Sequence, residues 1–484
     1  MQGGELRDRV AGGVAWSVAE KGASMLLQMV VSIIVARLLS PDDYGLMAIL
    51  TVFTSVAVMV VDSGFSQALI RGEEPAPQDY KAVLLFNVTM SLLSYGLLMA
   101  LTPAVARYYD EPMLLTIAPV LYLLLPLNAL GVTQNAYLSR QFRFDIISKI
   151  VFCSSFISGL TSVVMALAGC GVWSLVAQRV VQMGVKSLLL WIYGAWRPAK
   201  GWSVSPIKRM APFSLRILFT DIVNTLYNNL PSLFVGKIYS VTTLGFFNQA
   251  QKLKDLPVMS ATQSVQNVTL PALSRIEGSE EKFSDSLRRL LMVVAFVMFP
   301  AMVGVIAVAE PMFALLLGEK WLPTVPYFKV ICLTGLFAPL AAIILNVLKV
   351  RCEDGRAIVR CEIAKKLFMT LALAVAIPWS VEALVWALVA VSIVDLVVNL
   401  VAVSHYSGFR AGMLLRSILP IGVIVAAMYM VVVAVIASLA EFSSAIQLLA
   451  GIASGVVTYV ALALGFRLEA VGELMQTLRG FLKN

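Results

Sequence analysis

The feature that most constrains the fold is a series of apolar stretches that follow one another along the whole chain, separated by short polar or Gly/Pro turns. Each is about 20 residues long, enough to cross the hydrocarbon core of a bilayer as a helix. Composition agrees, because 59% of the 484 residues are hydrophobic and only 13% are charged. We predict an all-α polytopic membrane protein of about fourteen transmembrane helices, at residues 13–36, 45–70, 82–104, 113–136, 146–168, 171–194, 211–236, 241–270, 288–308, 324–348, 357–379, 382–404, 413–438 and 443–466.

The distribution of Lys and Arg between alternate turns predicts the orientation. With a cytoplasmic N-terminus, the inside segments carry 27 of these residues, and the outside turns carry only Arg37, Arg107, Lys237 and Lys320. Positive charge concentrates on the cytoplasmic side of membrane proteins, so both termini are predicted to be cytoplasmic. The net charge of +9 is then a topology signal, and no nucleic-acid partner is expected.

The turns between the spans are short, which leaves no room for a catalytic domain outside the membrane, and no enzyme activity is expected. The five cysteines form no disulfide pattern, and His405 is the single histidine, so neither a zinc site nor another cofactor is expected. The N-terminal MQGGELRDRV leads into an apolar stretch without an A-x-A site, and this stretch is expected to stay as the first helix. Residues 467–484 predict an amphipathic tail along the inner membrane surface.

An internal repeat is visible in two places. VARLLSPDDYGL at 35–46 matches VGKIYSVTTLGF at 235–246, and VWSLVA at 172–177 matches VWALVA at 385–390. The offsets, 200 and 213, each correspond to one block of six helices. The repeat predicts two six-helix bundles in parallel orientation around a central cavity. The predicted parts are an N-terminal lobe (1–200), a C-terminal lobe (201–408), two extra helices (409–466) and the cytoplasmic tail (467–484).

Several motifs resemble the polysaccharide transporter family of the multidrug/oligosaccharidyl-lipid/polysaccharide flippase superfamily, most closely its WzxC-like branch. They occur in the family's order: ARLLSPDDYGLMA (36–48), VDSGFSQALI (61–70), AGCGVWSLVAQ (168–178), VGKIYSVTTLGFFNQAQKL (235–253), LPALSRI (270–276) and LLGEKW (316–321). The resemblance implies a MATE-like fold and a flippase that moves undecaprenyl-diphosphate-linked oligosaccharide repeat units across the bacterial inner membrane by alternating access. A polysaccharide polymerase and chain-length or export machinery would be its partners. The resemblance fixes no binding residues.

Polar residues form stripes inside two of the predicted helices. In 241–270, Asn248, Gln251, Lys252 and Asp255 fall within about 100° of arc, and Gln266 continues the stripe. Gln249 and Lys254 fall outside it. In 211–236, a second stripe contains Arg216, Thr220, Asn224 and Tyr227, with Asp221 and Asn228 at its border. Since ionisable groups in a membrane usually face a cavity or a partner, both stripes are predicted to line the cavity.

A lipid diphosphate carries negative charge that Arg and Lys neutralise, and sugars present hydroxyls that suit amides and aromatic rings. The predicted substrate-binding residues are Arg216, Lys252, Asn224, Asn228, Asn248, Gln251, Gln266, Arg179 and Tyr227. Glu20, Asp62, Asp221 and Asp255 are candidates for coupling to an ion. The charged residues also have a simpler interpretation. Lys252 and Asp255 would form an internal salt bridge, and the other carboxylates would pair with Lys21 or Arg216. Asp395 has no evident partner.

Three functional classes stay open at this point. A cation-coupled multidrug or small-molecule exporter would use the same scaffold, but predicts a smaller, more apolar cavity with one dominant carboxylate. A membrane enzyme acting on polyprenyl glycans predicts a large periplasmic loop. A lipid II flippase is the nearest variant of the oligosaccharide flippase, and the PDDYG and GVWSL motifs favour the polysaccharide branch.

Overall fold

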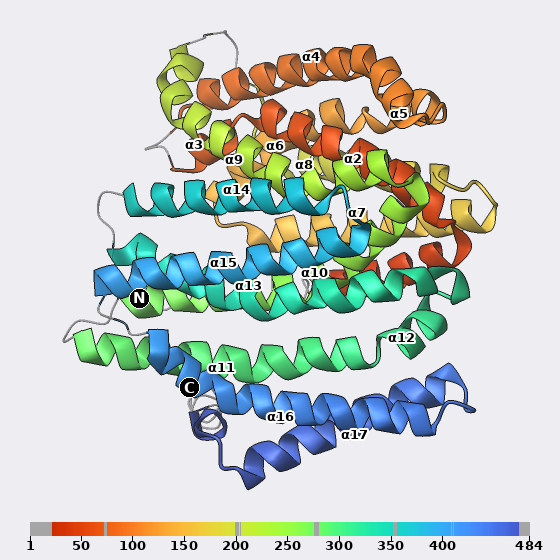
Figure 1. Cartoon of the computed structure of the whole chain (residues 1–484). Helices are drawn as coiled ribbons and strands as arrows, with labels where there is room; N and C mark the ends of the chain where they lie inside the picture. The colour runs from red at the N-terminus through yellow and green to blue at the C-terminus, as the bar shows by residue number, and fades with distance from the viewer. Residues whose placement is uncertain are drawn as a thin grey trace. The chain divides into compact units, whose positions relative to one another are not determined.

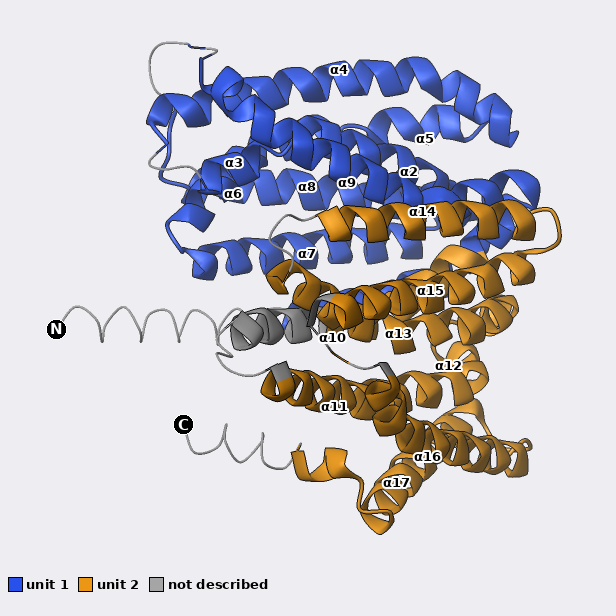
Figure 2. Ribbon diagram, turned by 60° about the vertical axis from the view of Figure 1, so that its left-hand side comes forward, with its two compact units in different colours: residues 1–245 blue, residues 246–484 orange. Residues whose placement is uncertain are grey.

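The structure is a computed structural model that describes residues 22–71, 75–198, 203, 205–274, 280–351, 356–407, 409 and 411–473. These residues fold into long helices joined by short turns (Figure 1). The chain forms two compact units, residues 1–245 and 246–484 (Figure 2). The predicted lobe boundary near residue 200 follows the repeat rather than these units, and it stays a prediction.

Unit 1 contains helix Gly22–Leu38, α2 (Pro41–Asp62), α3 (Phe65–Arg71), α4 (Pro77–Tyr109), α5 (Leu114–Leu121), α6 (Leu124–Arg140), α7 (Phe144–Leu167), α8 (Trp173–Tyr193), α9 (Ser205–Ile238) and the start of α10 (Val241–Ser274). Unit 2 contains the rest of α10, α11 (Glu280–Ala307), α12 (Ala309–Leu316), the 3₁₀ helix η1 (Glu319–Thr324), α13 (Val325–Arg351), α14 (Arg356–Ala376), α15 (Val381–Ser407), α16 (Ala411–Ser438) and α17 (Ser444–Gly465).

Ten helices of the described residues are long and apolar enough to cross a membrane, so the chain is a multi-pass membrane protein. The other four predicted spans also coincide with helices. They are the described part of 13–36, which is an apolar helix of fewer residues, and α9, α10 and α14, whose sequences are more polar. The all-helical architecture is therefore confirmed, and the count of fourteen stays a prediction.

The predicted span 45–70 is broken in the structure. Ser63 and Gly64 adopt left-handed conformations, with φ of 47° and 72°, which end α2 and start α3. Ser63 also closes the end of α2, because its backbone N–H donates to the carbonyl of Met59 at 2.8 Å. The break leaves Asp62 at the last position of α2, beside the first turn of α3. The predicted span 113–136 is likewise split, into α5 and α6.

Two turns that the sequence analysis assigned to the outside, residues 39–45 and 239–245, fold alike and pack against each other within unit 1. Ser40 caps α2 by bonding Asp43, and Ser240 caps α10 by bonding Thr243, at positions 200 residues apart. The contacts are reciprocal. A Cβ added at Gly45 would lie 2.0 Å from the Val241 carbonyl oxygen, and one at Gly245 would lie 2.0 Å from that of Pro41. Asp42 accepts a hydrogen bond from Thr242, its own equivalent in the repeat.

Contacts of this kind are typical of two-fold symmetry: Gly45 touches Val241, and the equivalents of these two residues in the repeat, Gly245 and Pro41, touch each other as well. The sequence repeat at offset 200 therefore corresponds to a structural repeat at this turn. Both glycines are required by the close approach of the two backbones rather than by an unusual φ.

Contacts at both of its ends hold α9 in unit 1. Near its N-terminal end, the Arg209 guanidinium lies 2.7 Å from the buried Asp79 carboxylate of α4. Near its C-terminal end, the Tyr109 hydroxyl donates to the Leu233 carbonyl at 3.2 Å, and Lys237 lies 4.6 Å from the centre of the Tyr108 ring. These contacts fix the helix that carries the predicted polar stripe of Arg216, Thr220, Asn224 and Tyr227.

Candidate functional site

The stripe on α9 begins well inside the helix. Arg216 is the twelfth of its 34 residues, about 16 Å from its first residue, and its side chain is exposed. Thr220 lies one turn further on and donates to the Arg216 carbonyl at 3.0 Å. Of the other predicted residues on α9, Asn228 is exposed, whereas Asp221, Asn224 and Tyr227 are half-buried.

The stripe on α10 contains the second predicted phosphate ligand. Lys252 is exposed, and Asn248 and Gln251 are half-buried. Asp255 forms its ion pair with Lys254 at 2.7 Å, whereas the sequence had suggested Lys252 as its partner. The Lys254 side chain is long enough to reach the carboxylate of the next residue, Asp255. A prediction from the angular positions of residues around the helix does not take this reach into account. Gln266 lies in α10, but its side chain, like all of Glu20, is outside the described residues.

α8 brings two cations into unit 1. Arg179 is exposed on this helix, and Lys186, about two turns further along, is half-buried. Between them, the Gln182 amide lies 3.4 Å from the hydroxyl oxygen of Ser155 on α7. Lys186 lines a cavity in the described part of unit 1.

This cavity, of about 150 Å³, lies between α2, α3, α6 and α8. Asp62 and Ser66 line it from the α2–α3 break, and the Ser66 hydroxyl donates to the Asp62 carboxylate. Its other polar lining residues are Asn128, Asn135, Lys186 and Ser187. The structure thus brings the predicted coupling candidate Asp62 together with Lys186. It adds Asn128 and Asn135, which the sequence analysis missed because isolated amides in an apolar helix give no periodic signal.

An ion cluster connects α14 and α15 in unit 2. The Lys365 ammonium lies 2.8 Å from the Asp395 carboxylate, 2.5 Å from that of Glu362 and 3.3 Å from the amide oxygen of the buried Asn399. Asp395, for which the sequence showed no partner, is therefore paired. Lys365 itself lies in the third turn of α14, with only 11% of its side chain exposed.

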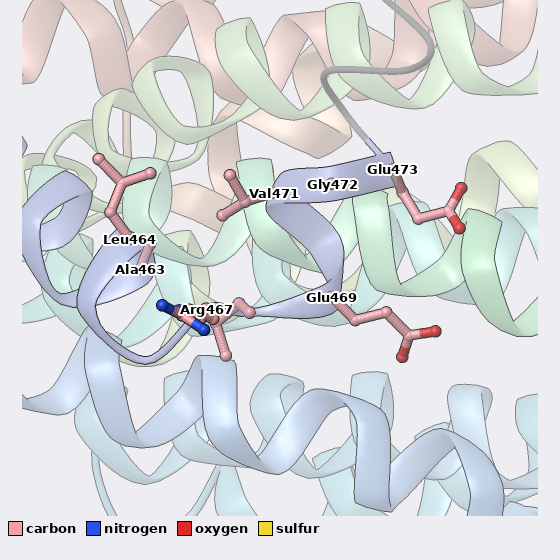
Figure 3. Close-up of a pocket in the computed structure, with 8 residues that line it drawn as sticks. Ala463, Leu464, Arg467, Glu469, Val471, Gly472 and Glu473 are labelled. Atoms are coloured by element: carbon pink, nitrogen blue, oxygen red, sulfur yellow. The ribbon is translucent and has the colours of Figure 1, made fainter.

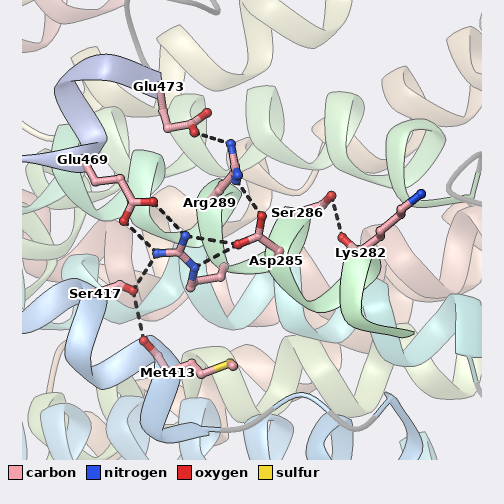
Figure 4. Close-up of polar contacts among 9 residues, drawn as sticks. Lys282, Asp285, Ser286, Arg289, Met413, Ser417, Glu469 and Glu473 are labelled. Carbon is pink, nitrogen blue, oxygen red and sulfur yellow. Dashed lines mark hydrogen bonds and ion pairs between the residues drawn. The ribbon is translucent and has the colours of Figure 1, made fainter. Parts of the chain in front are cut away.

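A second cluster in unit 2 lies near the start of α11, where Arg288 binds both carboxylate oxygens of Glu469 at 2.8 Å each (Figure 4). Arg288 also lies 3.1 Å from Asp285, and Arg289 bridges Asp285 and Glu473. The described start of the tail is thus tied to α11. Next to it, Arg467 lines a pocket of about 480 Å³ at the bend after α17 (Figure 3). Residues 474–484 of the predicted amphipathic tail lie outside the described residues.

The Arg288 contacts predict acid release of the tail. Hydrogen bonding to Arg288 lowers the pKa of Glu469 below its usual value of 4.5. When the pKa of a carboxylate is lower in the folded state than in the unfolded state, the group stabilises the fold at pH values above its unfolded pKa. That stabilisation is lost as the pH falls through the lowered pKa.

We expect limited proteolysis to cleave the tail several-fold faster at pH 3 than at pH 7. Glu469→Gln should be cleaved faster already at pH 7, and Glu441→Gln, which changes an exposed carboxylate in the turn between α16 and α17, should behave like the unaltered protein. Equal cleavage of all three at pH 7 would contradict the assignment.

Comparison of the sequence with known proteins finds similarity to proteins of polysaccharide biosynthesis. The profile of a family described as polysaccharide biosynthesis protein matches residues 34–326. The succinoglycan biosynthesis transport protein ExoT of Rhizobium meliloti (strain 1021) is 25% identical over 334 residues, 68% of this chain and 67% of that protein. The lipopolysaccharide biosynthesis protein WzxC of Escherichia coli (strain K12) is 24% identical over 337 residues, 68% of each chain.

Solved structures identify the fold. The lipid II flippase MurJ in an inward closed conformation superposes with a TM-score of 0.74 at 14% identity, covering 94% of this chain and 99% of that one. An inward-facing multidrug resistance MATE family transporter gives a TM-score of 0.60 at 13% identity, covering 80% and 95%. The predicted MATE-like fold is thereby confirmed.

Proposed function

Because the chain belongs to the polysaccharide biosynthesis protein family, we propose that it is the flippase for an undecaprenyl-diphosphate-linked oligosaccharide used in surface polysaccharide assembly. ExoT is named as a transport protein of polysaccharide synthesis, and the fold is that of transporters and flippases. The protein would act in the bacterial inner membrane with both termini cytoplasmic. The excess of Lys and Arg in the predicted inside segments supports this orientation.

The observation that carries the proposal is a pair of exposed cations deep within polar helices. Arg216 and Lys252 lie inside the predicted membrane spans 211–236 and 241–270, and each is the twelfth residue of its helix. A cation at such a depth costs about 3 kcal/mol to insert, so its presence calls for a function. The diphosphate of a lipid-linked glycan is a suitable anion, and arginine can bind a phosphate through two parallel hydrogen bonds.

The remaining polar residues of these helices suit the glycan. Asn224, Tyr227 and Asn228 on α9, with Asn248 and Gln251 on α10, offer amides and a phenol for sugar hydroxyls. Arg179 and Gln266 complete the proposed set of substrate-binding residues. A polysaccharide polymerase would receive the translocated unit on the outer side.

We expect Arg216→Ala and Lys252→Ala each to reduce polymer export at least tenfold, since a charge-assisted hydrogen bond contributes about 1.5–3 kcal/mol. The measurement is surface polymer in a strain lacking the gene, complemented at equal membrane abundance of each variant. Lys208→Ala is the matched control, because Lys208 is an exposed cation near the inner end of the same α9. Full export by both variants would contradict the binding assignment.

A further inference from the structure

The chain turns sharply at the end of α17, and the turn carries an arginine where helices usually carry a glycine. Phe466 is the C-cap of α17, and Arg467 follows it with a φ of 47°. The Arg467 N–H donates to the Leu464 carbonyl at 3.1 Å, and the next N–H, of Leu468, donates to the Ala463 carbonyl at 3.2 Å. This is the Schellman arrangement, whose left-handed position favours glycine because a Cβ raises its energy. Strained residues of this kind cluster at ligand-binding and catalytic sites, which directs attention to the Arg467 side chain.

The pocket of about 480 Å³ lies at this turn (Figure 3). Its volume is within the range of about 300–1,000 Å³ that is usual for small-molecule sites. Arg467 is the cation of the lining, and the apolar surface comes from Ala463, Leu464, Leu468 and Val471. A guanidinium beside apolar side chains suits a ligand that has both an anionic group and hydrocarbon.

The two carboxylates of the lining are already bound by α11. Glu469 accepts hydrogen bonds from both terminal nitrogens of Arg288, and Glu473 forms an ion pair with Arg289 (Figure 4). Both carboxylates point away from Arg467 in Figure 3. Within the described part of the chain, the Arg467 guanidinium itself has no hydrogen-bond or ion-pair partner.

The sequence after the turn offers Arg467 no acidic partner either. Residues 474–484 contain Arg479 and Lys483 and no Asp or Glu. An anion that binds Arg467 would therefore come from outside this part of the chain.

The position of Arg467 relative to α17 indicates which anion is at hand. The 22 residues of α17 are apolar enough to cross a membrane, and at 1.5 Å per residue they extend about 33 Å, close to the thickness of the hydrocarbon core. A cation two residues beyond the end of such a helix lies at the level of the lipid head groups. Beside it, Leu464 and Phe466 are 55% and 71% exposed, which leaves apolar surface for acyl chains.

We propose that the turn after α17 binds the phosphate group of an anionic membrane phospholipid, with Arg467 as its ligand and Leu464, Leu468 and Val471 in contact with the acyl chains. A guanidinium can hold a phosphate through two parallel hydrogen bonds. A zwitterionic lipid fits less well, because the Glu469 and Glu473 carboxylates that would attract its ammonium group are bound to α11. The inference is independent of the proposed function, since no glycan takes part.

Hydrogen exchange of the full-length protein in lipid nanodiscs tests the site. In the unaltered protein, nanodiscs of phosphatidylcholine with phosphatidylglycerol should slow exchange of the backbone amides of residues 463–473 several-fold relative to phosphatidylcholine alone. Arg467→Gly and Arg467→Gln should both lose this difference. An anionic membrane also changes the pH at its surface, but this effect acts on the variants as well and cancels in the comparison.

The two Arg467 variants separate binding from the conformation of the turn. Glycine relieves the left-handed backbone and glutamine keeps it strained, so a loss shared by both comes from the missing guanidinium. Arg360→Gln is the matched control, because Arg360 is an exposed cation of α14 outside the lining, and this variant should keep the full lipid effect.

Retention of the phosphatidylglycerol effect in either Arg467 variant would overturn the proposal, and so would equal exchange of the unaltered protein in the two kinds of nanodisc. Inorganic phosphate added to the phosphatidylcholine nanodiscs should leave exchange unchanged, and slowing by phosphate would assign the pocket to a free anion instead of a lipid. None of these samples contains a lipid-linked glycan. A negative result therefore refutes the lipid site alone, whereas failure to move the glycan refutes the proposed function alone.

Discussion

Gly45→Val and Gly245→Val should each prevent most of the protein from accumulating in folded form, and the two losses should be nearly equal. Each new side chain would begin 2.0 Å from a backbone carbonyl oxygen, at Val241 in one case and at Pro41 in the other. Overpacking of a close contact costs about 1–3 kcal/mol when side chains adjust, and backbone adjusts less readily than a side chain. We therefore expect the upper end of that range or more for each variant.

The measurement is thermal unfolding of detergent-purified protein, with membrane abundance as a second readout. Gly96→Val is the matched control, because Gly96 is also within a membrane helix, α4, and a Cβ there meets nothing within 4 Å. The milder double variant Gly45→Ala/Gly245→Ala should cost less than the sum of its two single changes, since both disturb one contact. Strict additivity, or a loss confined to one glycine, would contradict the two-fold contact.

Lys365→Met is the second change with a large expected effect. It leaves Glu362 and Asp395 without the ammonium that lies between them, and breaking a fully buried ion pair in this way costs about 3–5 kcal/mol. Because the two carboxylates are 39% and 37% exposed and therefore screened by solvent, we expect a loss of stability below that range, about 1–3 kcal/mol. Unfolding by heat or denaturant in detergent gives the loss.

Two further variants separate the ion cluster from a general effect of charge. Arg360→Met removes an exposed cation from the same α14 and should change stability little. Adding Asp395→Asn to Lys365→Met should recover part of the loss, because one of the two unpaired charges disappears. If Lys365→Met is no less stable than Arg360→Met, the cluster does not stabilise the packing of α14 on α15.

The elements that could be predicted from sequence are those that depend on local patterns. An apolar stretch of about 20 residues forms a helix in a bilayer whatever its neighbours are, because every backbone group must be paired within it. Apart from the breaks at Ser63 and between α5 and α6, the predicted spans therefore coincide with helices of the structure. The offset of 200 between residues 35–46 and 235–246 can also be read directly from the aligned sequences. The caps at Ser40 and Ser240, which occupy equivalent positions in that alignment, were seen only in the structure.

The features that were missed depend on which helices become neighbours. Lys365 and Asp395 are 30 residues apart, and no local pattern indicates that α14 packs on α15 with these residues facing each other. The break at Ser63 puts a residue other than glycine in the left-handed region, which sequence rules reserve mainly for glycine. The unit 1 cavity depends on both kinds of information, since it needs that break and the packing of α6 and α8 beside it.

The central claim is that this protein moves a lipid-linked oligosaccharide between leaflets, and a vesicle assay tests it most directly. Undecaprenyl-diphosphate-linked glycan from cells lacking the gene is reconstituted with and without the purified protein, and a membrane-impermeant oxidant of sugars is added outside. Protein-free vesicles should keep their inner-leaflet glycan protected, whereas vesicles with the protein should lose nearly all protection, and those with the Arg216→Ala/Lys252→Ala variant should lose it at least tenfold more slowly. Protection that is unchanged by the folded, unaltered protein would contradict the account.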